Sequence, residues 1–116
     1  MKPIITSLVT VASLIATSSA LAMDMPPLAK KSNCTACHKI DTKSVGPAWL
    51  DIAKKYKGAT KFTYNGKEYP LEEGLVMKVS KGGSGNWGTM PMPANAPAVN
   101  SADIKELVKF VLDLAK

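Results

Sequence analysis

The pentapeptide Cys34-Thr35-Ala36-Cys37-His38 decides how the rest of this 116-residue chain is interpreted. Two thiols at this spacing can reach the two vinyl groups of one porphyrin, and the imidazole that follows can turn onto the iron. The pattern is typical of covalent c-type haem attachment, in which Cys34 and Cys37 form thioether bonds and His38 ligates the iron. The chain has only two cysteines and one histidine, so the sequence predicts a single haem c.

Two close cysteines can also serve other chemistry. A disulfide or a thioredoxin-like redox pair is one alternative, but no βαβ pattern surrounds Cys34 and Cys37. A structural zinc site needs four thiolate or imidazole donors, and two cysteines with His38 supply only three. Haem attachment is therefore favoured, and thiol redox chemistry stays open as a minor alternative.

The N-terminal segment, residues 1–22, predicts export. It has a charged start at Lys2, an apolar stretch broken by Ser and Thr, and a small-x-small end at Ala20-Leu21-Ala22. These features are typical of a cleaved signal peptide. The apolar stretch is shorter than the roughly 20 residues that a membrane span needs, which disfavours a retained anchor. Residues 23–116 are expected to form one small domain in the periplasm, without stable membrane insertion after cleavage.

Charge points to protein partners. Without Lys2 the chain carries 14 lysines and no arginine against nine acidic residues, a net charge of +5. Nucleic-acid binders commonly use arginine for bidentate contacts, and an exported protein rarely meets nucleic acid, so we expect no nucleic-acid binding. The basic balance suits transient docking to acidic redox proteins.

Hydrophobic spacing predicts four helices. The first starts at Pro26-Pro27 and runs into the haem motif, and the second opens with Pro47 as its first residue and stops at Gly58. The third covers residues 71–81, and the last follows a cap at Asn100 or Ser101. Asn65-Gly66, between aromatic residues, signals a hairpin turn within residues 60–70. Residues 82–99 form a long loop, which is typical of a functional segment.

The sixth position on the iron separates electron carriers from open haem sites. No second histidine exists, and lysine amines are normally protonated, so the thioether donors are Met23, Met25, Met77, Met90 and Met92. Pro91 and Pro93 restrict the backbone around Met92, which lowers the entropy lost in holding its sulfur on iron. Met92 is the favoured ligand on these grounds, and Met90, which also precedes a proline, stays open.

Taken together, the chain resembles the short bacterial class I cytochromes c, single-haem electron carriers of the periplasm. The resemblance covers nearly all of the chain after residue 22. Its motifs are the lysine-rich helix before Cys34, Val45-Gly46-Pro47-Ala48, Trp87-Gly88, Pro91-Met92-Pro93-Ala94-Asn95 and the last helix. It implies an all-α fold of about four helices around one haem, with a short hairpin excursion near residues 62–70. The excursion and Trp49 depart from the usual pattern.

The resemblance also implies residue roles. His38 and Met92 would be the axial ligands, and the Pro47 carbonyl would accept the other N–H of the His38 imidazole. Trp87 would donate its indole N–H to a haem propionate, and Asn95 would bond near the Met92 sulfur.

The expected function is one-electron transfer rather than enzymatic catalysis. The expected partners are a membrane cytochrome complex, a terminal oxidase, a reductase or a peroxidase, met by a monomer. Lysines near the motif, Lys30, Lys31, Lys39 and Lys43, would steer acidic partners. Methionine ligation would give a higher potential than two histidines. The alternatives are a haem sensor or peroxidase-type protein with an open sixth position.

Overall fold

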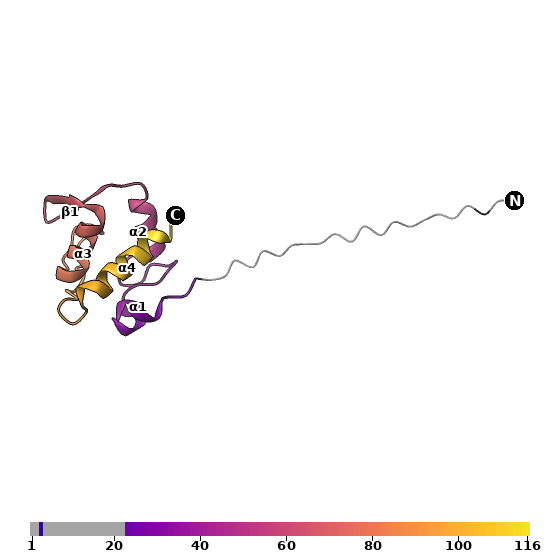
Figure 1. Cartoon of the computed structure of the whole chain (residues 1–116), viewed down its shortest axis with the longest axis horizontal. Coiled ribbons are helices and arrows are strands. Elements are labelled where there is room, and N and C mark those ends of the chain that lie inside the picture. The colour runs from indigo at the N-terminus through magenta and orange to yellow at the C-terminus, as the bar shows by residue number, and fades with distance from the viewer. Residues whose placement is uncertain (1–2, 4–22) are drawn as a thin grey trace.

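The computed structural model describes Pro3 and residues 23–116 (Figure 1). The predicted signal peptide, residues 1–22, lies outside the described residues except for Pro3, so it stays a prediction. In chain order the described elements are α1 (Pro27–Lys31), the 3₁₀ turn η1 (Cys34–Ala36), α2 (Trp49–Tyr56), β1 (Lys61–Tyr64), β2 (Lys67–Pro70), α3 (Leu71–Lys81) and α4 (Ser101–Asp113).

Helix α4 organises the core. It runs between α3 and α2 and also contacts α1 (Figure 1). Ile104 and Val108 on one side of α4 join a hydrophobic cluster with α3 and β1, whereas Leu107 and Val111 join a second cluster with α1 and α2. This three-and-four spacing is the pattern that predicts an amphipathic helix, and here it divides one helix between two clusters.

The predicted hairpin is present. Strands β1 and β2 pair antiparallel, with Phe62 opposite Tyr69 and Tyr64 opposite Lys67. The turn residues Asn65 and Gly66 have φ angles of 49° and 76°, the two positive values that a type I′ turn requires. Phe62 and Tyr64 are buried on one face of β1. The hairpin therefore packs on α3 through aromatic side chains and is part of the core.

Helix α2 begins two residues later than expected. Pro47 was predicted as its first residue, but the helix starts at Trp49. The backbone N–H groups of Trp49 and Leu50 donate to the carbonyls of Lys39 and Ile40, at 2.9 and 2.8 Å. These bonds satisfy two N–H groups that a helix start leaves without intrahelical partners. Pairing with a segment before Gly46, which local propensity does not encode, therefore sets the start.

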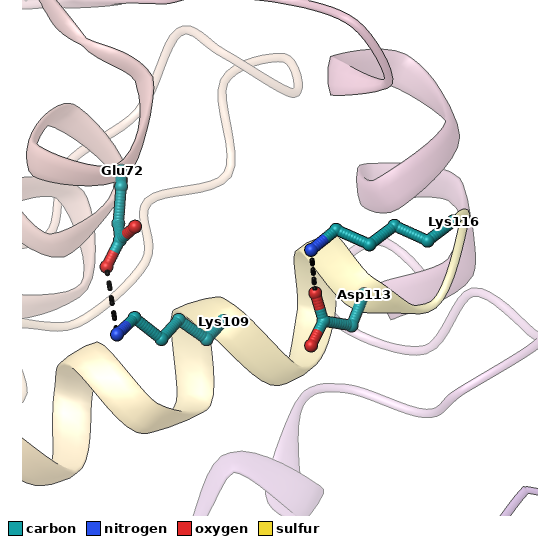
Figure 2. Close-up of polar contacts among 4 residues, drawn as sticks. All are labelled: Glu72, Lys109, Asp113 and Lys116. Carbon is teal, nitrogen blue, oxygen red and sulfur yellow. Dashed lines mark ion pairs between the residues drawn. The ribbon is translucent and has the colours of Figure 1, made fainter.

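Helices α3 and α4 follow the expected bounds closely. Helix α3 covers the predicted residues 71–81, and Asn100, one of the two expected caps, accepts a hydrogen bond at 2.9 Å from the N–H of Asp103. Two exposed ion pairs lie nearby (Figure 2): Glu72 to Lys109 at 3.9 Å, between α3 and α4, and Asp113 to Lys116 at 2.7 Å. Such exposed pairs contribute little to stability, so packing holds the helices together.

Within the part of the chain that the structure describes, none of the helices has the length and apolar character that crossing a bilayer requires.

Candidate haem-binding site

A cavity of about 430 Å³ opens between the helices and the loop of residues 82–99. Its volume lies within the range of roughly 300–1,000 Å³ that is usual for cofactor sites. Cys34, Cys37 and His38 line it together with hydrophobic side chains, including Val45, Pro47, Trp49, Ile52, Phe62, Leu75, Val79, Leu107, Val108 and Val111. Segments far apart in sequence thus enclose the attachment motif in apolar surroundings.

The attachment motif is held by its own backbone bonds. Asn33 has φ of 60° and reverses the chain after α1. The N–H groups of Cys37 and His38 both donate to the Cys34 carbonyl, at 3.2 and 2.9 Å. Both thiols are half-buried and unbridged, and burial raises the pKa of the Cys34 thiol from its ordinary value of 9.0. The two thiols therefore line one cavity as separate groups.

His38 is buried and fixed in orientation. Its Nδ1 lies 2.8 Å from the Pro47 carbonyl oxygen, the contact that the resemblance implied. A carbonyl only accepts hydrogen bonds, so Nδ1 carries a proton, and in the neutral ring Nε2 keeps its lone pair. The Trp49 ring stands 6.2 Å from the imidazole, centroid to centroid. The unusual Trp49 is thus a buried wall beside His38.

The loop brings Met92, Met90 and Trp87 to the same cavity. Met92 exchanges two backbone hydrogen bonds with Gly83, each of 2.9 Å, and its side chain is half-buried. Met90 is 63% exposed and Trp87 39% exposed, so both stand at the mouth. Of the two methionines, Met92 is the one whose backbone is paired across the loop.

Asn95 is not brought into the lining of this cavity. Its side-chain nitrogen donates to the carbonyls of Val79 and Pro93, at 3.1 and 3.3 Å, and its backbone N–H donates to Val79 at 3.1 Å. These bonds tie the loop to the end of α3. The implied role of Asn95 near the Met92 sulfur stays a prediction.

Several residues at the site were missed from sequence. Lys78 lines the cavity, its Nζ donates to the Gly83 carbonyl at 2.6 Å, and burial lowers its pKa from 10.5. Lys55 lies 4.4 Å from the centre of the Trp87 ring and donates to the Asn86 carbonyl at 2.7 Å. A lysine on a helix carries no local signal of such contacts. The length of the loop, residues 82–99, was the one feature of the sequence that hinted at such contacts, since a long ordered loop needs side chains that hold it in place.

The residues present fit a covalently attached haem. Two half-buried thiols and an imidazole whose Nδ1 is bonded to Pro47 line an apolar cavity, and a thioether from the loop lines it too. This donor set is the one that c-type haem ligation uses. The apolar lining suits a large hydrophobic macrocycle.

Known proteins are similar to this chain. The family model for cytochrome c matches residues 26–115. Cytochrome c-551 of Allochromatium vinosum is 47% identical over 87 residues, which cover 75% of this chain and 82% of that protein. Cytochrome c-552 of Nitrosomonas europaea is 46% identical over 88 residues, 75% of each protein.

Solved structures agree on the fold. The crystal structure of wild-type Nitrosomonas europaea cytochrome c552 matches with a TM-score of 0.61 and 44% identity, covering 75% of this chain and 95% of that one. The class 1 cytochrome MtoD of Sideroxydans lithotrophicus ES-1 matches with a TM-score of 0.60 and 25% identity, covering 77% of this chain and 90% of that one. The chain therefore belongs to the cytochrome c family, as a small class I cytochrome with one covalently attached haem c.

Proposed function

We propose that this protein is a periplasmic electron carrier whose haem is anchored by Cys34 and Cys37 and ligated by His38 and Met92. The observation that carries the proposal is the shared cavity: His38, fixed by Pro47, and Met92, fixed by Gly83, both line it. The haem iron supplies reversible one-electron oxidation and reduction. The protein's task is to keep both ligands in place and to exclude water.

His38 meets the first requirement. Its Nδ1–H bond to Pro47 fixes the ring and leaves Nε2 as the donor atom, and such a bond raises the basicity of the ligating nitrogen. Because Trp49 and His38 are both buried, water has little access to this side. A ligand held in this way need not reorganise when the charge on iron changes.

Met92 is supported over Met90 by backbone geometry. The paired bonds with Gly83 hold Met92, whereas Met90 is mostly exposed and makes no backbone hydrogen bond in the part of the chain that the structure describes. A pre-ordered backbone reduces the entropy lost on ligation. Methionine ligation also favours a high reduction potential of the haem, which suits electron transfer late in a respiratory chain.

Partner docking would use the cavity mouth. Val45, Trp87 and Met90 form an exposed apolar rim there, and Lys43 lines the same cavity. Lys30, Lys31 and Lys39 are also exposed. An apolar centre with lysines suits brief contact with an acidic surface. The lysine charges guide the encounter, and the apolar side chains then pack against the partner.

One optical experiment tests the ligand set. The ferric holoprotein is expected to show the weak long-wavelength band of iron–thioether ligation. Met92→Ala should abolish this band and let carbon monoxide bind the ferrous form, while the matched variant Met90→Ala should keep the band. A wild-type protein without the band that binds carbon monoxide readily would instead support an open-site sensor or peroxidase.

Export is tested separately. We propose cleavage after Ala22, so the protein isolated from the periplasmic fraction should have the mass of residues 23–116 plus one haem. Recovery of uncleaved chain in the membrane fraction would contradict this and support a retained anchor.

A further inference from the structure

The hairpin reaches the loop that carries Met92. We propose that Tyr64 is a positioning residue for that loop: its hydroxyl holds Gly82, and through Gly82 it limits how often the sixth iron position opens to outside ligands. This inference rests on the proposed ligation by Met92. If Met92 did not ligate the iron, Tyr64 would be an ordinary aromatic residue of the core.

The first contact is a buried hydrogen bond. The Tyr64 hydroxyl donates to the Gly82 carbonyl at 2.9 Å, and the Tyr64 side chain is 8% exposed. No other donor reaches this carbonyl within the described residues. Loss of the hydroxyl would leave a buried acceptor unpaired, and an unpaired acceptor favours any movement that exposes it to water.

Gly82 passes this restraint to Met92. It sits so close to the loop that a Cβ on it would lie 2.8 Å from the Ala94 nitrogen and would overlap the Met92 carbonyl oxygen. The next residue, Gly83, exchanges both backbone hydrogen bonds with Met92. A shift of Gly82 away from Tyr64 therefore displaces the backbone on which the Met92 sulfur is carried.

The hairpin is a firm support for this contact. The Tyr64 ring belongs to the cluster with Phe62, Leu75, Ile104 and Val108, so it is anchored on α3 and α4. The neighbouring residue of β1 adds a second contact, because the Asn86 side-chain nitrogen donates to the Thr63 carbonyl at 3.1 Å. Consecutive residues of one strand thus hold the loop at Gly82 and at Asn86.

The test uses the ferric holoprotein and imidazole as the outside ligand. Imidazole binds only when Met92 leaves, so its apparent affinity measures the open fraction of the loop. For Tyr64→Phe we expect the thioether band to remain in the absence of imidazole and the imidazole affinity to rise about fivefold to tenfold. Amide hydrogen exchange at Gly83 and Met92, read by NMR, should quicken by a similar factor.

Two controls separate positioning from general weakening. Tyr69→Phe removes a hydroxyl from the other strand of the same hairpin, one without a hydrogen bond in the described structure. Asn100→Ala removes the α4 cap and lowers global stability without touching the loop contact. Neither variant should change imidazole affinity by more than about twofold.

Three results would overturn the positioning role. These are an unchanged imidazole affinity in Tyr64→Phe, an equal rise in Asn100→Ala, or unchanged exchange at Gly83 and Met92. Exchange reports opening of the Gly83–Met92 backbone pair whichever group is the sixth ligand. A wild-type protein without the thioether band would refute ligation by Met92, while faster exchange in Tyr64→Phe would still support the contact between hairpin and loop.

Discussion

Gly46 lies directly against the His38 imidazole: a Cβ at this position would stand 2.6 Å from Cε1 and 3.0 Å from Nδ1. The ring cannot retreat freely, because its Nδ1 is bonded to the Pro47 carbonyl and the buried Trp49 packs beside it. The requirement for glycine here is therefore one of space. It arises from contact with His38, the residue that we propose as an iron ligand.

The variant Gly46→Ala should move the imidazole. We expect a loss of about 2 kcal/mol in unfolding free energy, the usual size of overpacking, together with a shifted NMR resonance of the His38 Nδ1 proton. Gly58→Ala is the control, because no atom of the described residues lies within 4 Å of its Cβ and only its φ of 75° resists substitution. Gly58→Ala should cost about 1 kcal/mol and leave the resonance in place. Equal resonance shifts in both variants would contradict the steric account.

Gly74 offers a second test, in which two effects oppose each other. Alanine in the interior of α3 should gain about 1 kcal/mol of helix propensity. A Cβ at Gly74 would, however, lie 2.8 Å from both Cβ and Cδ1 of Phe62, and overpacking of this kind costs about 1–3 kcal/mol. We expect Gly74→Ala to lower the unfolding free energy measured by chemical denaturation.

The steric cost of a side chain at position 74 should fall when Phe62 is truncated. In a Phe62→Ala background β1 has room to shift, so Gly74→Ala should cost about 1 kcal/mol less than in the wild type. Additive effects in this double-mutant cycle would show that the Phe62 ring is not what excludes a side chain at Gly74.

Tyr56 should make stability depend on alkaline pH. Burial raises its pKa above the ordinary value of 10.0. Between the two pKa values the unfolded chain loses the phenolic proton before the folded protein does, so the folded state binds more protons and its stability falls as pH rises. The contribution is fully present below pH 10.0 and is lost as pH passes the folded-state pKa.

Chemical denaturation from about pH 8 to about pH 11 measures this dependence. Tyr56→Phe should flatten the alkaline part of the profile, whereas Tyr69→Phe should not. A Tyr56→Phe profile that falls as steeply as the wild type would assign the loss to other groups.

Local signals in the sequence predicted which helices and strands form and where the attachment motif lies. Asn65-Gly66 predicted the turn, and the spacing of apolar residues predicted α3 and α4, because each depends on neighbours along the chain. The start of α2 was predicted wrongly, since the bond from Trp49 to Lys39 that sets it spans ten residues. Local chemistry cannot encode such pairing.

The same reason explains what was missed at the site. Tyr64 was expected only as part of the hairpin excursion near residues 62–70, but its hydroxyl reaches Gly82, 18 residues away. Lys55 reaches Asn86 over 31 residues. The contact of His38 with Pro47 was anticipated only through family resemblance. Residues that attach the cofactor share one short motif, whereas residues that hold the loop are brought together only by folding.

Charge at the cavity mouth gives the last prediction. Lys43 lines the mouth and is exposed, whereas Lys105 is exposed on α4 and does not line the cavity. If local charge steers partners, oxidation of the ferrous protein by ferricyanide, an anion, should slow about twofold to fivefold in Lys43→Gln and much less in Lys105→Gln. The two variants lose the same net charge, so the comparison isolates position.

The wild-type rate should also fall with added salt, because salt screens exposed charges beyond roughly 10 Å at 0.1 M. With tris(1,10-phenanthroline)cobalt(III), a cationic oxidant, both trends should reverse sign. Equal slowing in Lys43→Gln and Lys105→Gln would mean that net charge alone guides encounter and that the mouth lysine has no special part in docking.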